Sequence, residues 1–117
     1  MNEIDIPIIK KTSDFYKLFH EYRRLIPKQD RHSIYEKAER IIINILEYFL
    51  EAGYIKGAGK VVMLEKASVK LNVLRFFIRL MKELKSLDNK KYVALQEMID
   101  EIGRMLGGWI KSSSTMR

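Results

Sequence analysis

A row of apolar side chains near the C-terminal end of the chain sharply narrows the choice of fold. Gly103, Gly107 and Gly108 lie within the same stretch, although a glycine inside a helix costs about 1 kcal/mol relative to alanine. Three such glycines predict close approach of another element, which indicates tight helix packing and assembly. The row is spaced by three and four residues, as on one side of an α-helix, and comprises Tyr92, Leu95, Ile99, Ile102, Leu106 and Trp109.

The sequence predicts one all-α domain over residues 1–117. Pro27 forbids continuation of the first helix, for which Ser13 is a candidate cap. The pair Asp88 and Asn89 predicts a turn that caps the last helix, and residues 112–117 are expected to be a disordered tail. Short connections favour an antiparallel up-down-up-down four-helix bundle. The predicted helices cover residues 12–26, 30–54, 60–87 and 88–111.

The composition sets limits on the class of protein. The chain has no cysteine, so thiolate metal sites and disulfides are excluded. We expect a cytoplasmic protein without a signal peptide or membrane span. The formal charge is +7, concentrated in residues 10–28 and 60–85, which favours a polyanionic partner. The alternative is that the charge serves solubility alone.

The predicted helix over residues 60–87 carries two apolar rows, where packing on one side needs only one. The row of Leu64, Ala67, Leu71, Leu74, Ile78 and Met81 is the candidate core. A second row lies more than about 90° away. It either makes this helix central within a monomer or forms a surface for self-association. The second row, our candidate oligomer interface, consists of Val62, Val69, Val73, Phe76 and Leu80.

Two sets of basic residues are candidate contacts for phosphates. One set follows a line on the first helix, although its last member lies beyond Pro27, where the chain can leave the helix. A solvated charged face is the commoner explanation for such a line on a single helix. The other set flanks the core row of the third helix, where Glu83 could instead neutralise Arg79. The first set is Lys10, Lys17, Arg24 and Lys28, and the second is Arg75, Arg79 and Lys82 on one flank with Lys66 and Lys70 on the other.

Residues suited to catalysis are few, so we expect no enzyme, cofactor, metal or small-molecule substrate. His20 and His32 lie in separate segments without a cysteine companion. The carboxylates of Glu97, Asp100 and Glu101 lack the Glu-x-x-His pattern of a two-metal bundle site, and we expect solvent exposure or salt bridges for them. Exposed aromatic rings can stack on single-stranded bases. Tyr16, Tyr35 and Tyr54 are candidates for that role, although packing or interface roles are the expectation.

Two motifs, LRFFIRL at residues 74–80 and EIGRMLGGWI at residues 101–110, resemble the accessory variability determinant (Avd) proteins of diversity-generating retroelements. The resemblance implies a homopentameric barrel of four-helix bundles with a positive surface. It also implies a non-enzymatic role in mutagenic reverse transcription, with the element's reverse transcriptase and sequence-tolerant RNA or DNA as partners. Carried over by position, Arg75, Arg79 and Arg104 are the motif arginines, and Gly103, Gly107, Gly108 and Trp109 are the packing residues.

A sister family, encoded within intervening sequences of large-subunit ribosomal RNA genes, has a similar bundle. It carries a segment resembling Ser-Asn-Ile-Ala-Glu-Gly in its second helix. The corresponding stretch here, residues 41–50, reads IIINILEYFL and lacks that segment, which favours the retroelement family. The alternative is a stand-alone scaffold of the intervening-sequence type with no polymerase partner. A bacterial, archaeal or phage gene fits either family.

Overall fold

The computed structural model describes residues 6–115 and is helical almost throughout that range. Four long helices and two short helical turns form a rod of 46 × 22 × 20 Å, and no strand occurs among the described residues. The predicted all-helical class is therefore confirmed. The elements are α1 (Ile6–Tyr22), η2 (Arg23–Leu25), α2 (Lys28–Arg31), α3 (Ile34–Ala52), α4 (Ala58–Glu83) and α5 (Asn89–Thr115).

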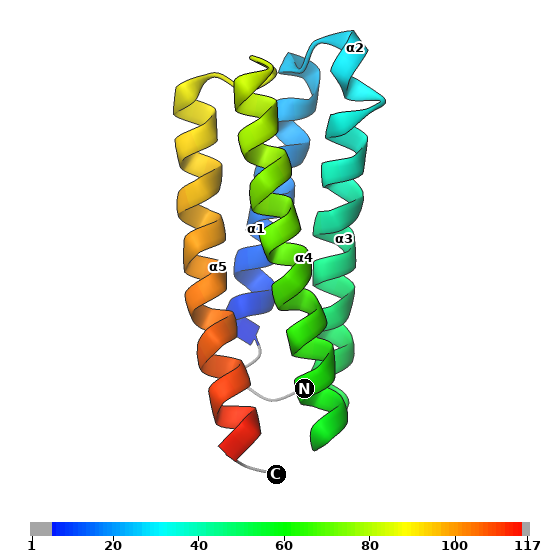
Figure 1. Cartoon of the computed structure of the whole chain (residues 1–117), viewed down its shortest axis with the longest axis vertical. Coiled ribbons are helices and arrows are strands. Elements are labelled where there is room, and N and C mark those ends of the chain that lie inside the picture. Colours follow the sequence, from blue (N-terminus) through cyan, green and yellow to red (C-terminus); the bar gives the residue numbers. More distant parts are fainter. Residues whose placement is uncertain (1–5, 116–117) are drawn as a thin grey trace.

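The four long helices form a ring in which each packs on two neighbours. Helix α3 contacts α1 and α4, and α5 contacts α4 and α1, so α1 lies diagonally opposite α4. Figure 1 shows the chain rising through α1, descending through α3, rising through α4 and descending through α5. Because each helix has two neighbours, each keeps one face on the outside of the bundle.

The core of the bundle holds a buried aromatic group contributed by α1 and α3. The rings of Phe19 and Tyr35 stack with centroids 4.4 Å apart, and Phe15 continues the stack along α1. The Tyr35 hydroxyl donates a hydrogen bond to the Phe19 carbonyl oxygen at 2.8 Å. Burial raises the pKa of Tyr35 well above its ordinary value, with Glu39 adding to the effect. This hydrogen bond satisfies the one polar group that the tyrosine brings into the core.

The first helix begins earlier than residue 12, the predicted start. Helix α1 starts at Ile6, and Pro7 is tolerated in its first turn because the first amide groups of a helix need no intrahelical acceptor. Ser13 lies within the helix, where its hydroxyl donates to the Ile9 carbonyl oxygen at 2.8 Å. The prediction that Ser13 caps the helix is therefore wrong.

The predicted single helix over residues 30–54 is interrupted near its start. The short helix α2 ends at Arg31, and Ser33 has non-helical backbone angles before α3 begins. The Ser86 hydroxyl donates to a carboxylate oxygen of Asp30 at 2.5 Å, which ties α2 to the α4–α5 connection. A tertiary contact therefore accompanies a break that the helical spacing did not reveal.

The connection from α4 to α5 shortens the predicted third helix by four residues. Lys85 adopts a φ of 64°, and the Ser86 amide donates to the Met81 carbonyl oxygen at 2.8 Å, as in a left-handed helix C-cap. Asp88 then caps α5, as predicted, by accepting from the Lys91 amide at 2.8 Å. Hydrogen bonds from the Lys91 side chain and amide lower the pKa of Asp88.

Helix α5 continues four residues beyond Lys111, its predicted end. The structure is helical through Thr115, and the Ser112 hydroxyl donates to the Trp109 carbonyl oxygen at 3.1 Å. The prediction of a disordered tail is therefore wrong for residues 112–115, because buried Trp109 anchors the preceding turn against the bundle. Residues 116–117 lie outside the described range.

Candidate functional site

Helix α4 presents uncovered apolar side chains on the side away from the core. Val69 is 62% exposed and Phe76 61%, while Val62 is 49% and Val73 36% exposed. Leu80 is half-buried. The candidate core row on the same helix is buried, as expected. We call the row of Val62, Val69, Val73, Phe76 and Leu80 the outer face of α4. The described part of the chain leaves this face open, so a central position of α4 within residues 6–115 does not account for the second row.

The cations on the α5 side of the core row have partners within the chain. The Arg75 guanidinium pairs with the Asp100 carboxylate of α5, and the Arg79 Nε lies 3.2 Å from a carboxylate oxygen of Glu83. The Lys82 ammonium lies 4.6 Å from the centroid of the Tyr92 ring. Surface pairs of this kind contribute only about 0–1 kcal/mol, so a polyanion could compete for these cations.

The cations on the α3 side of the same row are unneutralised. Lys66 is exposed and Lys70 is half-buried. Within residues 6–115 neither forms an ion pair. The α3 flank of α4 therefore carries cations without an ion-pair partner among the described residues, whereas the arginines of the α5 flank are paired.

The predicted basic line of the first segment does not run along one helix. Lys10 and Lys17 lie on α1, and the Lys10 ammonium is 3.0 Å from the Asp14 carboxylate. Arg24 belongs to η2 and Lys28 to α2. Pro27, with extended backbone angles, redirects the chain and separates Lys28 from the other three basic residues. Lys28 therefore leaves the line of the first helix, and phosphate contact by these four residues stays a prediction.

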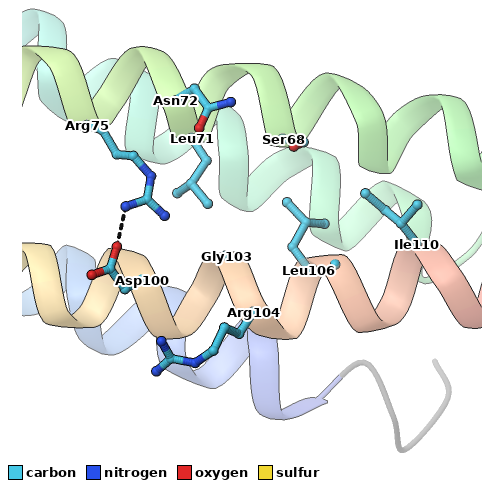
Figure 2. A pocket seen from close by; sticks show the side chains of 10 residues that line it. Ser68, Leu71, Asn72, Arg75, Asp100, Gly103, Arg104, Leu106 and Ile110 are labelled. Carbon is cyan, nitrogen blue, oxygen red and sulfur yellow. Dashed lines mark hydrogen bonds and ion pairs between the residues drawn. The ribbon is translucent and has the colours of Figure 1, made fainter.

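The motif of α5 borders a groove of about 400 Å³ between α4 and α5 (Figure 2). A Cβ at Gly103 would lie 3.0 Å from Arg75 Nη2 and 3.6 Å from Leu71 Cδ2, so the glycine lets α4 side chains lie close to α5. At Gly107 and Gly108 a Cβ would meet nothing within 4 Å. Within the chain, the expected close packing therefore holds for Gly103 and not for Gly107 or Gly108.

The other motif residues occupy different surroundings. Trp109 is buried and its ring lies 6.1 Å from that of Phe49. Arg104 is exposed and has no ion pair among the described residues. In Figure 2 the Arg104 side chain lies on one side of α5 and the Arg75–Asp100 pair lies on the opposite side. Arg75 and Arg104 both line the groove, on different sides of α5, whereas Arg79 does not line it.

The acidic cluster predicted on α5 includes salt-bridge partners. Asp100 pairs with Arg75, and a Glu101 carboxylate oxygen lies 2.8 Å from the Lys11 ammonium of α1. Across the described range, no set of three or more histidine, cysteine, aspartate or glutamate side chains is placed to hold a metal ion. Glu97 is exposed. The geometry of Asp100 and Glu101 is that of ion pairing between helices.

The remaining candidate side chains are largely engaged in packing. Tyr35 is buried, and Tyr16 is half-buried with its hydroxyl 3.4 Å from a Glu39 carboxylate oxygen. Partial burial, and then Glu39, raise the pKa of Tyr16. Tyr54 alone of the three candidate tyrosines is exposed enough to stack on a base. The histidines lie apart on the surface, His20 beside Tyr16 and His32 near Glu36.

Sequence reasoning missed a second concavity, of about 680 Å³, where α1 gives way to η2 and α2. It is lined by His20, Glu21, Arg23, Arg24 and Arg31. The signal was the pair of arginines before Pro27 and another arginine four residues after it. The spacing alone did not show that the turn brings them together.

The fold and surface define a small, basic, all-helical bundle with an apolar outer face. Among residues 6–115, none of the helices combines the length and apolar character needed to cross a bilayer. A family model described as bAvd-like matches residues 7–113, so the chain belongs to the bAvd-like family. The resemblance read from the two motifs is thus confirmed. A comparison with curated proteins finds no match.

Proposed function

We propose that this protein is a non-enzymatic accessory factor of a diversity-generating retroelement. It binds the element's reverse transcriptase together with template RNA or its cDNA, and it supports mutagenic reverse transcription. Membership of the bAvd-like family over residues 7–113 is the observation that carries this assignment. The basic composition, with a formal charge of +7, supports a polyanionic partner.

The same proposal includes assembly into a homopentameric barrel of antiparallel bundles through the outer face of α4. Exposed apolar surface of this extent is unusual on a monomer. Burying the exposed part of Val69 and Phe76 against a second copy would contribute about 1–2 kcal/mol for each side chain. A Cβ at Gly107 or Gly108 would meet no atom of another described part of the chain within 4 Å, which leaves room for a neighbour. Five copies at +7 carry a formal charge of +35.

The mechanism that follows is electrostatic. Binding of RNA to such a surface releases counterions, so its affinity falls steeply with salt. Because contacts go to phosphates, the binding tolerates different sequences. Holding template and polymerase on one assembly raises the effective concentration of each for the other.

RNA binding and polymerase capture test this function directly. We expect salt-sensitive binding of single-stranded RNA by fluorescence anisotropy, and capture of the reverse transcriptase by the tagged protein. Replacing both Arg75 and Arg79 by alanine should weaken RNA binding at least about tenfold, since each charge-assisted contact contributes more than about 1.4 kcal/mol. Arg40→Ala is the matched control, because Arg40, like Arg79, is paired within its own helix, with Glu36 at 3.1 Å.

Two results would contradict the proposal. Intact RNA and polymerase binding in the double variant would show that Arg75 and Arg79 are not the contacts. No uptake of RNA at micromolar protein and low salt would favour the stand-alone scaffold instead.

Sedimentation tests the assembly separately. Five chains of 13.9 kDa give about 70 kDa, and replacing Val69 and Phe76 by serine should release the 13.9 kDa monomer. Leu25→Ser is the matched control, because Leu25 is an exposed apolar residue of η2 rather than α4. A wild-type mass of 13.9 kDa at all concentrations would exclude the pentamer.

A further inference from the structure

The arginines of this chain fall into two groups by their partners. Those on α3 and α4 are each paired with a carboxylate: Arg40 with Glu36, Arg75 with Asp100 and Arg79 with Glu83. Four others in residues 6–115 form no ion pair, namely Arg23, Arg24, Arg31 and Arg104. Three of these four line the concavity of about 680 Å³ at the end of α1. Unneutralised guanidinium groups are therefore concentrated at one end of the bundle, where Figure 1 shows α2.

The turn around Pro27 builds this concavity. Helix α1 gives way to η2, and the extended backbone at Ile26 and Pro27 turns the chain into α2. The Arg31 guanidinium spans the turn. Its Nη2 donates to the Ile26 carbonyl oxygen at 3.0 Å and lies 3.5 Å from that of Arg24. Because Ile26 is buried, the turn is anchored to the core and holds Arg31 beside η2.

One donor in this arrangement is left without an acceptor. The Nε atom of Arg31 is buried and has no hydrogen-bond partner in the described chain. A buried donor without a partner costs about 1–3 kcal/mol. The Nε atom itself is out of a ligand's reach, so the positive charge of the concavity comes from the guanidinium groups as a whole.

The charges in the wall favour an anion. Arg23, Arg24 and Arg31 face a single carboxylate, Glu21, and the exposed imidazole of His20 completes the lining. Guanidinium groups present planar forks of donors that match phosphate oxygens in a bidentate manner. Arg31 already donates through Nη2 to backbone carbonyl oxygens, so the free forks are those of Arg23 and Arg24. Three guanidinium charges against one carboxylate leave an excess of about two, which favours an anion with two or more negative charges, such as a terminal phosphate.

We propose that this concavity, which we call the α1–α2 pocket, binds a compact phosphate group with two or more negative charges. The group is either free, as pyrophosphate, or the terminal phosphate of a larger molecule. The inference goes beyond the proposed function, since it requires neither the polymerase nor the assembly of several chains.

Titration with inorganic pyrophosphate, followed by NMR of the arginine Nε–Hε signals, tests the pocket. We expect saturable shifts at Arg23, Arg24 and Arg31, while Arg40 and Arg79 stay unchanged. Shifts that do not saturate, or that are equal at all arginines, would overturn the proposal.

Substitutions that are expected to change pyrophosphate affinity in opposite directions distinguish loss of the site from loss of folding. Replacing Arg23 and Arg24 together by glutamine should weaken pyrophosphate binding at least about tenfold, whereas Glu21→Gln, which removes the opposing charge, should strengthen it. Arg40→Gln should leave the affinity unchanged and is the matched control. Equal affinities in all three variants would contradict the assignment.

A second titration distinguishes free from attached phosphate. A 5′-phosphorylated trinucleotide that shifts the same three arginines, while its dephosphorylated twin binds at least about tenfold more weakly, would show recognition of a terminal phosphate. Binding of pyrophosphate alone would show a site for free anions, and either result supports the pocket. Equal binding of both trinucleotides would overturn it in favour of backbone phosphodiester contact. If the protein does not bind RNA but pyrophosphate still binds saturably to the α1–α2 pocket, the proposed function is wrong and the proposal of a phosphate pocket is supported.

Discussion

Replacing Gly107 and Gly108 by alanine is expected to stabilise the fold of a single chain. Both glycines lie inside α5 (Asn89–Thr115) and are exposed. Neither has a positive φ, and a Cβ at either position meets nothing within 4 Å. Alanine therefore removes the conformational freedom of glycine without creating a clash.

The expected gain follows from helix propensity alone. Each substitution should contribute about 1 kcal/mol, and the pair about 2 kcal/mol. For a chain of 117 residues, the unfolding entropy near 60 °C is about 0.25 kcal/mol/K, so the midpoint should rise by about 4 °C for each alanine and about 8 °C for both.

Thermal unfolding followed by circular dichroism measures this gain. The assay is best run in a background with Val69 and Phe76 replaced by serine, so that self-association does not contribute. Gly103→Ala is the control, since its Cβ would lie 3.0 Å from Arg75 Nη2 and must displace that guanidinium, which offsets part of the gain.

An unchanged or lower midpoint in the Gly107→Ala, Gly108→Ala variant would refute the reasoning. On the wild-type surface, the same two alanines should weaken self-association in sedimentation, because they would obstruct a neighbouring chain. A more stable chain that assembles less well would explain why these glycines are present.

Three further predictions concern the stability of the fold. Tyr35→Phe removes the hydroxyl that donates to the Phe19 carbonyl oxygen and should lower the free energy of unfolding in urea by about 0.5–1.5 kcal/mol. Because burial raises the folded-state pKa of Tyr35, the wild type loses stability as the pH rises above 10, and the variant should lose less. Lys85→Gly relieves a residue at φ 64° and should raise the free energy of unfolding by about 0.5–1 kcal/mol; a lower value would contradict the C-cap geometry. Hydrogen bonds from Lys91 lower the folded-state pKa of Asp88, so the Asp88 carboxylate stabilises the fold above its ordinary pKa of 3.8, and this stabilisation is lost as the pH falls through the lowered pKa. Asp88→Asn should therefore make the midpoint of thermal unfolding less dependent on acid pH, and an unchanged dependence would contradict this role of Asp88.

The helical spacing of the apolar residues was enough to predict the long helices and their inner faces. Pro27 and Asp88 act on neighbouring backbone, so their effects could be read locally. Two of the failures involve contacts distant along the chain. Ser86 contacts Asp30 near the break before α3, and buried Trp109 anchors the helical turn that continues past residue 111.

The candidate site was predicted less completely than the fold. The outer face of α4 followed from counting apolar rows, because side-chain direction on a helix is set by sequence position. The Arg23, Arg24 and Arg31 group was not found, because a turn brings these residues together.

The sequence by itself determined the helical class, the two apolar rows of α4 and the excess of positive charge, since each depends on composition or on the 3.6-residue period of a helix. Only the tertiary structure decided which charges pair between helices. Whether Arg75 meets Asp100, or Lys11 meets Glu101, depends on the order and rotation of packed helices. These are set by the burial of the whole core, which the local sequence does not encode.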